Sequence, residues 1–292
     1  MSTIFSTDHY FHIGEWHSHA GKPCQDHALS EVGSRSAFIS IADGCSSGKE
    51  TDIGARILNL STLAALREET HSHENLSEVG AGRIAMRQEL LLEQAGNLLG
   101  LKEDDLLATC LHAALNEDGG YVSVQGDGVV AIKFHDGRLL LRRFEWANNM
   151  PFYPAYRSRR LQDFISAHGG DVDALRFSET IWTGNGAGGW EQETVLEHRI
   201  RDGIEGIVIP LARGEEIEFV ALFSDGVTQM KELDWKEAVC RFTAFKSTAG
   251  EFLKRRMIRA IGESERAGGG PLDDIACAII RSETKKQTEE KT

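Results

Sequence analysis

The chain has 292 residues, of which 41% are hydrophobic and 26% charged, as is typical of one large or two small soluble globular domains. It lacks a long uninterrupted apolar run, and residues 1–14 lack the pattern of a signal peptide, so we expect a cytoplasmic protein without a membrane partner. The net charge of −13 argues against nucleic acid as a partner, because nucleic-acid-binding proteins usually carry a basic face.

The first half of the chain predicts a strand, two helices and a meander. Residues 38–42 form an apolar run that ends in an Asp-Gly turn, which is typical of a buried strand. Apolar residues recur at helical spacing over residues 52–68, and a second helix is expected over residues 82–99. Four more strands are predicted at residues 107–115, 121–124, 129–134 and 138–144. Three glycine-containing turns separate them, so we expect consecutive hairpins in an antiparallel meander rather than a βαβ repeat.

Residues 145–213 are the least regular stretch, and we interpret them as an insertion or flap beside the site, with a few strands inside. The glycine cluster at residues 184–189 lacks the Lys-Ser/Thr of a phosphate loop, so it indicates a flexible loop.

The rest of the chain predicts strands at residues 219–223 and 275–280, with helices at residues 235–245 and 250–261 between them. We expect a single domain over residues 1–281. Residues 282–292, at the end of the chain, are polar or charged and are predicted to form a disordered tail.

Cysteines and histidines do not predict a zinc site. The five cysteines are widely spaced without a C-x-x-C pair, which argues against a disulfide framework and structural zinc. Four histidines lie between residues 9 and 19, but no cysteines have the spacing of a zinc site. Surface or packing roles are therefore favoured for them.

Carboxylates accompany the predicted strand ends and turns. The aspartates concerned are Asp26, Asp43, Asp127, Asp225, Asp273 and Asp274. One Asp-Gly after a strand is usually only a turn, but antiparallel neighbours can bring several such residues to one edge of a sheet. Packed carboxylates repel one another unless they are protonated or bind cations, and oxygen ligands select Mg²⁺ or Mn²⁺ over Zn²⁺. This predicts two-metal phosphoryl hydrolysis, by a phosphatase or a nuclease.

Five motifs, in order and spacing, resemble those of the type 2C protein phosphatases, particularly a bacterial branch of that family. They are SHAGKPCQD (residues 18–26), IADG (41–44), QGDG (125–128), FSDGV (223–227) and LDDIA (272–276). The resemblance covers about residues 14–281. It implies an αββα sandwich of the α+β class, with two antiparallel sheets flanked by helices.

The resemblance also implies roles for individual residues. The implied metal ligands are Asp26, Asp43, Gly44, Asp127, Asp225 and Asp273, and the catalytic residues among them are Asp43, Asp225 and Asp273. Asp43 would bridge two Mn²⁺ or Mg²⁺ ions, and Asp127 would belong to a third, weaker site. A metal-bridging hydroxide would attack phosphorus in line with the leaving serine or threonine oxygen, without a covalent enzyme intermediate.

The chain departs from the family pattern at several positions. Gln25 replaces a glutamate that some members carry, and Cys45 replaces the histidine proposed as general acid in eukaryotic members. Metal-bound water or His19 would then protonate the leaving group, and Lys22 or His19 would replace a phosphate-binding arginine. Asp274 replaces an asparagine, and we expect it to have a structural role.

The leading hypothesis is a protein phosphatase that acts on phosphoserine or phosphothreonine and opposes a cognate Ser/Thr kinase in a bacterium. The alternative is a pseudophosphatase that binds phosphoproteins, which Gln25 and Cys45 favour and the intact aspartates oppose. A two-metal nuclease is disfavoured by the acidic balance and by the order of the motifs.

Overall fold

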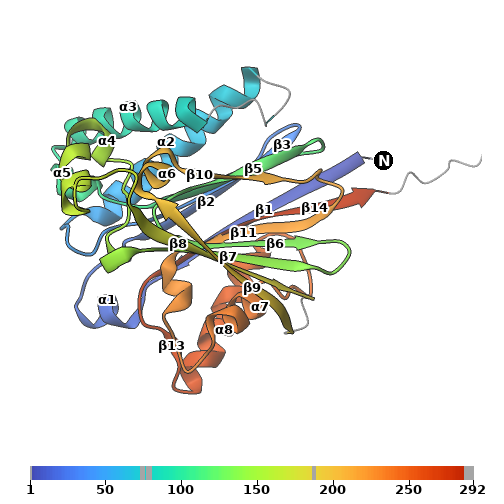
Figure 1. Cartoon of the computed structure of the whole chain (residues 1–292). Coiled ribbons are helices and arrows are strands. Elements are labelled where there is room, and N and C mark those ends of the chain that lie inside the picture. The colour runs from blue at the N-terminus through green and yellow to red at the C-terminus, as the bar shows by residue number, and fades with distance from the viewer. Residues whose placement is uncertain (1, 73–75, 77–80, 186–188, 286–292) are drawn as a thin grey trace, which may run out of the picture.

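The computed structural model describes residues 2–72, 76, 81–185 and 189–285. Two antiparallel sheets lie face to face and helices cover their outer faces, so the fold is an αββα sandwich of the α+β class (Figure 1). This confirms the predicted fold class. Within these residues, no helix combines the length and the apolar character needed to cross a membrane.

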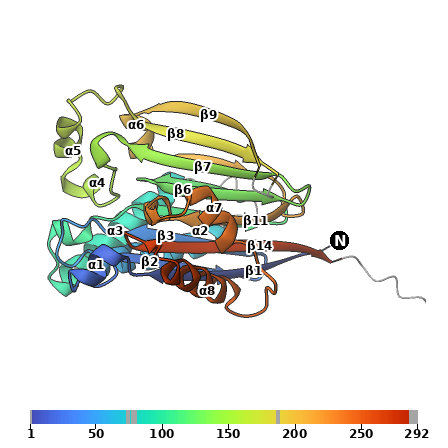
Figure 2. The ribbon, with the colours of Figure 1, turned by 90° about the horizontal axis from the view of Figure 1, so that it is seen from below.

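The larger sheet has seven strands. In spatial order they are β1 (Ser2–His12), β14 (Ile275–Lys285), β11 (Ile217–Phe223), β6 (Gly128–Phe134), β7 (Leu139–Trp146), β8 (Leu175–Gly184) and β9 (Trp190–Arg199). Figure 2 shows this order from β9 at one edge to β1 at the other. β1 and β14 pair along their full length, so residues far apart in the sequence lie side by side.

The smaller sheet has five strands. Their order is β10 (Ile207–Leu211), β5 (Gly119–Gln125), β4 (Cys110–Asn116), β3 (Ser36–Asp43) and β2 (Asp26–Val32). A separate two-stranded ribbon pairs β12 (Met230–Lys231) with β13 (Gly270–Pro271).

Helices of two kinds complete the fold. The longer ones are α2 (Thr51–Ser72) and α3 (Ala81–Leu99) on the five-stranded sheet, and α7 (Trp235–Phe242) and α8 (Phe252–Arg266) on the seven-stranded sheet. The shorter ones are α1 (Glu15–His19), α4 (Tyr156–Arg159), α5 (Leu161–Ala167) and α6 (Ile200–Glu205), with the 3₁₀ turns η2 (Glu103–Leu106), η3 (Ala147–Asn149) and η4 (Asp225–Thr228). Both views place α1, α4 and α5 at the same end of the sandwich (Figures 1 and 2).

The central strands are buried on both faces, which explains their continuous apolar runs. In β11, Val220 and Leu222 face the core between the sheets, whereas Phe219 and Phe223 face the core under α7 and α8. Burying each such large side chain contributes about 1.5–3 kcal/mol, so these residues hold the two sheets together and fix α7 and α8 to the larger sheet.

The four strands predicted as one meander belong to two sheets. β4 pairs with β5 and β6 pairs with β7, as predicted, but β5 and β6 lie in different sheets. Residues 126–128 therefore form a crossing between the sheets and not a hairpin. All of β5 and most of β6 are buried, so the apolar pattern does not reveal which sheet each strand joins.

The two ends of the chain also differ from expectation. β1 was not predicted, and the prediction of a disordered tail is wrong for residues 282–285, because β14 continues along β1 to Lys285. The Ser282 hydroxyl is buried and donates to the carbonyl oxygens of Gly214 and Ile217. Residues 286–292 of the predicted tail, and residues 186–188 of the predicted glycine loop, lie outside the described residues.

Residues 145–213, interpreted as an insertion or flap, contribute strands to both sheets. β8 and β9 extend the seven-stranded sheet from β7, and β10 pairs with β5 at the edge of the five-stranded sheet. Between β7 and β8, α4 and α5 lie at the same end of the sandwich as α1.

Candidate metal centre

Two of the aspartates form a cross-strand pair at the end of the smaller sheet. Asp26 begins β2 and Asp43 ends β3, and the register places them directly opposite each other. Cβ atoms in such pairs lie about 4.5–5.5 Å apart. The N–H of Asp43 donates to the Thr109 hydroxyl at 3.3 Å, and its carbonyl accepts from the N–H of Thr109 at 2.9 Å. Both ends of the Asp43 backbone are thus fixed to the chain that leads into β4.

The larger sheet supplies the next carboxylates. β11 pairs with β14, and Asp225 follows the first of these strands while Asp273 and Asp274 precede the second. Gly226 allows the two segments to approach closely, because a Cβ there would lie 1.8 Å from the Asp274 carbonyl oxygen. The aspartates were expected to meet at one edge of a single sheet. They instead lie where two sheets end together.

Asp127 lies on the crossing between the sheets. The flanking Gly126 and Gly128 have φ angles of 107° and 133°, which residues with a Cβ rarely adopt. The indole N–H of Trp146, at the end of β7, donates to the Gly126 carbonyl at 3.0 Å. Glycine conformation and this hydrogen bond together hold Asp127 at the acidic end.

The carboxyl groups strongly affect one another. Burial, together with the neighbouring carboxyls of Asp26 and Asp225, raises the pKa of Asp43 well above its usual range. Burial is also the first cause of the raised pKa of each of three further members, Asp26, Asp127 and Asp225. Carboxylates packed in this way need protons or cations, and an oxygen-only donor set suits Mg²⁺ or Mn²⁺. The residues present therefore fit the expected ions.

Two polar side chains that the sequence analysis did not single out hold these carboxylates. The Ser224 hydroxyl is buried and donates to Asp26 Oδ2 at 2.6 Å, which links the two sheets. Gln229 Nε2 donates to Asp225 Oδ2 at 3.1 Å and to Asp273 Oδ2 at 3.4 Å. Because Ser224 directly precedes Asp225, the sequence could have suggested that Ser224 lies at the site. Nothing in the sequence pointed to Gln229.

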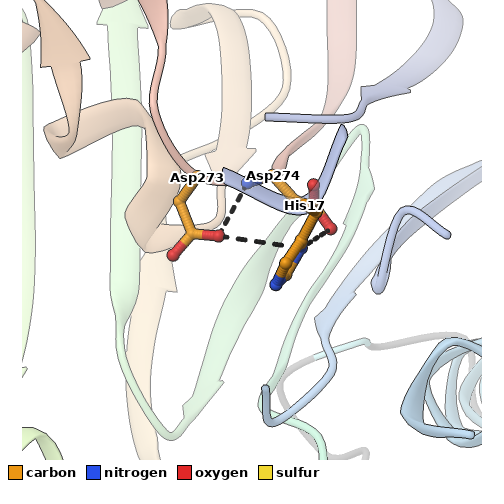
Figure 3. Close-up of side chains that lie close together, drawn as sticks. All are labelled: His17, Asp273 and Asp274. Carbon is orange, nitrogen blue, oxygen red and sulfur yellow. Dashed lines mark hydrogen bonds and ion pairs between the residues drawn. The ribbon is translucent and has the colours of Figure 1, made fainter. Parts of the chain in front are cut away.

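Asp274 fastens the N-terminal segment to the site. Its buried carboxylate accepts from the N–H groups of Gly14 at 2.8 Å and Gln25 at 2.6 Å, and lies 2.7 Å from Nδ1 of His17. Figure 3 shows the His17 ring between Asp274 and Asp273, whose Oδ1 lies 4.0 Å from the same nitrogen. The contacts of Asp274 agree with the structural role expected for it.

The two residues that depart from the family pattern have partners of their own. Gln25 Nε2 donates to the Thr51 hydroxyl at 2.8 Å, and its buried Oε1 accepts no hydrogen bond from the described part of the chain. The Cys45 thiol lies 3.0 Å from the Ser47 hydroxyl. Burial, followed by the nearby Cys45, raises the pKa of Tyr153, so residues 145–213 place a neutral phenol beside the loop that follows Asp43.

The histidines and the lysine near the N-terminus are dispersed. The His19 side chain is 75% exposed and 3.9 Å from Glu15, and Lys22 Nζ donates to the Ser46 carbonyl at 3.2 Å. His9 bonds Ser30, and His12 bonds Tyr10 and lies 3.7 Å from Glu265. Of these four histidines, only His17 belongs to a group of three possible metal ligands among the residues that the structure describes. The catalytic roles of His19 and Lys22 stay predictions.

An open pocket of about 400 Å³ adjoins the acidic cluster. Its lining includes Asp127 and Asp225 of the cluster, together with residues of β7 and η3: Arg143, Phe144, Glu145, Trp146 and Asn149. The pocket therefore connects Asp127 and Asp225 with solvent.

Comparison with known proteins agrees with this architecture. Residues 13–260 match the model of the protein phosphatase 2C family, and the chain belongs to that family. Asp273 and Asp274 lie beyond the matched residues. Comparison with the curated proteins finds no match.

Solved structures with the same fold include bacterial phosphatases. The serine/threonine phosphatase Stp1 from Staphylococcus aureus is 10% identical, with 97% of each chain covered and a TM-score of 0.54. PppA, described as a key regulatory component of T6SS in Pseudomonas aeruginosa, is 12% identical, with 97% of this chain and 100% of PppA covered and a TM-score of 0.52. At such identities, the likeness establishes the fold alone.

Proposed function

We propose that the protein hydrolyses phosphoserine and phosphothreonine in phosphoproteins, with Mg²⁺ or Mn²⁺ as its cofactor. The observation that carries this proposal is the cluster of buried and partly buried carboxylates, drawn from both sheets and adjoining an open pocket. Membership of the protein phosphatase 2C family supports the same activity.

The proposed ligands of two or three ions are Asp26, Asp43, Gly44 through its carbonyl, Asp127, Asp225 and Asp273. Asp43 lies opposite Asp26 in the register of β2 and β3, and burial, with the carboxyls of Asp26 and Asp225, raises its pKa, which supports a position shared by two ions. When bound, the ions would neutralise phosphoryl oxygens and acidify water. Asp127 approaches from the sheet crossing and suits the third, weaker position.

In the proposed reaction, water attacks phosphorus and the bond from phosphorus to the serine or threonine oxygen breaks. The leaving oxygen gains a proton, and inorganic phosphate is released. Ser224 and Gln229 contribute by holding the carboxylates of Asp26, Asp225 and Asp273 in place. Such supporting contacts commonly affect metal affinity or activity by about 10–100-fold.

The proposed substrate is a phosphoprotein that a cognate Ser/Thr kinase has modified, in the cytoplasm of a bacterium. The bacterial phosphatases that share the fold support this setting. The net charge of −13 argues against nucleic acid as a substrate.

A second candidate function is a phosphoprotein-binding module with weak catalysis. Gln25 favours it, because a neutral amide that donates to Thr51 is a poorer ligand than a carboxylate. Cys45 favours it as well, because its thiol replaces the histidine of eukaryotic members.

Release of p-nitrophenol from its phosphate ester, in EDTA, Mg²⁺ and Mn²⁺, tests the first function against the second. We expect activity that needs a divalent ion and falls by more than about 100-fold in Asp43→Asn and Asp273→Asn, beyond the usual effect of supporting contacts. Asp136→Asn is the matched control, because Asp136 lies in the exposed turn between β6 and β7. A folded wild-type protein without activity in any divalent ion would favour the binding module.

A further inference from the structure

We propose that Arg143 and Asn149 form an anion-binding subsite in the lining of the pocket that Asp127 and Asp225 also line. This subsite would take an anionic oxygen of a phosphopeptide substrate. The inference rests on the proposed function and deepens it, because it assigns the recognition of substrate charge to a strand outside the five motifs.

The position of Arg143 is the first argument. The side chain lies on β7 and lines the same pocket as Asp127 and Asp225. It is 27% exposed, and its guanidinium lies 5.8 Å from the centre of the Trp235 ring. Because an aromatic face attracts and restrains a cation, the group is held at the pocket and still accessible to a ligand.

Charge is the second argument. A substrate that carries a phosphoryl group must approach a chain with a net charge of −13 and a cluster of carboxylates. Positive charge in the lining of a pocket reduces this repulsion and raises the local concentration of an anion. Arg143 lines the same pocket as Asp127 and Asp225, so its positive charge lies near the carboxylates that a phosphoryl group must approach.

The ion pair of Arg143 is the third argument. Arg143 pairs with Glu145, two residues further along β7 on the same face of the strand, and the Glu145 side chain is 46% exposed. Exposed pairs of this kind contribute little, so a substrate anion can share or replace this carboxylate. A guanidinium is well suited to do so, because its planar fork binds carboxylate and phosphate oxygens in pairs.

The backbone after β7 is the fourth argument. Asn148 and Asn149 both have left-handed conformations, with φ angles of 59° and 52°. This region costs roughly 1–2 kcal/mol per residue, although asparagine tolerates it better than most. Such strain persists mainly at functional sites, and here it accompanies the placement of Asn149, an amide that can donate to an anion, in the pocket lining.

Two parts of a phosphopeptide carry suitable oxygens: the phosphoryl group itself and the carboxylate of an acidic residue beside the phosphoserine. The test compares hydrolysis of p-nitrophenyl phosphate and its inhibition by inorganic phosphate with hydrolysis of two phosphoserine peptides. The peptides differ only in whether the residues beside the phosphoserine are aspartate or asparagine. All assays use the full chain with Mn²⁺, and thermal unfolding of each variant verifies folding.

The variants are Arg143→Gln, Arg143→Lys and Glu145→Gln, with Arg138→Gln as the control for loss of one positive charge. Arg138 is exposed and pairs with Asp136 in the turn that precedes β7. We expect Arg143→Gln to raise KM by about tenfold or more, Arg143→Lys to raise it less, and Glu145→Gln to lower it. If Arg143→Gln also raises the KM for p-nitrophenyl phosphate and weakens inhibition by inorganic phosphate, the phosphoryl oxygen is the ligand. If only the KM for the aspartate peptide rises, the ligand is the carboxylate beside the phosphoserine.

The inference is overturned if Arg143→Gln and Arg138→Gln change every KM by the same factor. A wild-type chain that hydrolyses none of these compounds contradicts the proposed function, and calorimetric titration with the same two peptides then decides the inference separately. Weaker peptide binding by Arg143→Gln than by Arg138→Gln supports the subsite, whereas equal binding, or no binding by the wild type, overturns it.

Discussion

The carboxylate of Asp274 accepts a hydrogen bond from the backbone N–H of Gln25 at 2.6 Å, and so joins residues 249 positions apart. The same carboxylate accepts from Gly14 and contacts His17. The N-terminal segment that leads to Asp26 is thereby tied to the segment that carries Asp273. One buried carboxylate thus sets the distance between a proposed ligand of each sheet.

Asp274→Asn should destabilise the protein. An asparagine has one accepting oxygen, so at least one of the donors from Gly14, Gln25 and His17 would face an amide N–H₂ group. A buried donor without a partner costs about 1–3 kcal/mol, which corresponds to a fall in Tm of several degrees for a chain of this size. Thermal unfolding measures the change. Asp273→Asn is the control, because Asp273 is partly exposed, and equal Tm values for the two variants would contradict the role of Asp274.

Ser224→Ala should weaken metal binding and also lower stability, because the hydroxyl both donates to Asp26 and accepts from the N–H of Ala276 at 2.8 Å. The Ser224 hydroxyl donates to Asp26 Oδ2 at 2.6 Å, and hydrogen bonds to charged groups contribute about 1.5–3 kcal/mol. We therefore expect the Mn²⁺ concentration for half-maximal binding to rise about tenfold or more. Calorimetric titration of the metal measures it. Thr228→Ala is the control, because Thr228 Oγ1 donates to the backbone carbonyl of Asp225 and not to a carboxylate. If the affinity of Ser224→Ala for Mn²⁺ is unchanged, the hydrogen bond from Ser224 to Asp26 does not contribute to metal binding.

The sequence predicted those parts of the fold and site that depend on local patterns. Apolar runs that end in Asp-Gly located Asp43 and Asp225, and helical spacing located α2 and α3 to within a few residues. These signals are strong because the burial of a strand or of one helix face determines the hydrophobic pattern of consecutive residues.

Features that depend on long-range pairing were not predictable in the same way. β1 alternates weakly and contains polar residues such as Asp8 and His9, and it becomes a strand because β14 pairs with it. The crossing at Asp127 looked like a hairpin, because strands of either sheet are equally apolar. Gln229 is an ordinary polar residue in sequence, and only the fold brings it to Asp273, 44 residues away.

Trp146→Phe should loosen the crossing that carries Asp127. The indole N–H donates to the Gly126 carbonyl, and the ring stacks on Phe177 with centroids 4.5 Å apart. Phenylalanine keeps an aromatic face but removes the donor, so we expect a loss of about 1–3 kcal/mol in the free energy of unfolding. Urea unfolding measures it. Trp235→Phe on α7 is the matched control, because the Trp235 ring packs against Trp182 and Arg143. A larger loss in the control would argue against the hydrogen bond as the important contact.

Without metal, the protein should lose stability as pH rises. Burial and neighbouring carboxyls raise the pKa of Asp43 in the folded chain, and burial likewise raises the pKa of Asp26 and Asp225. The folded state then binds more protons than the unfolded chain at pH values above about 4, so stability falls as pH increases through the raised pKa values. Burial lowers the pKa of His27 and His112 to about 4, which opposes this trend between pH 5 and about pH 6.5, so the carboxylate effect is measured above that range, where Tm in EDTA should fall towards pH 8 and beyond.

Both bound Mg²⁺ or Mn²⁺ and the substitution Asp43→Asn should reduce this dependence of stability on pH, because each reduces the repulsion between the carboxylates. Saturating Mg²⁺ or Mn²⁺ replaces the protons and should raise Tm at pH 8, because a ligand that binds only the folded state stabilises it. Asp43→Asn removes one of the repelling charges, so in EDTA at pH 8 this variant should unfold at a higher temperature than the wild type, although it is expected to be inactive. Asp136→Asn, in the exposed turn before β7, should behave as the wild type does. If Asp43→Asn lowers Tm in EDTA at pH 8, the carboxylates are not in mutual repulsion and the electrostatic argument for the metal centre fails.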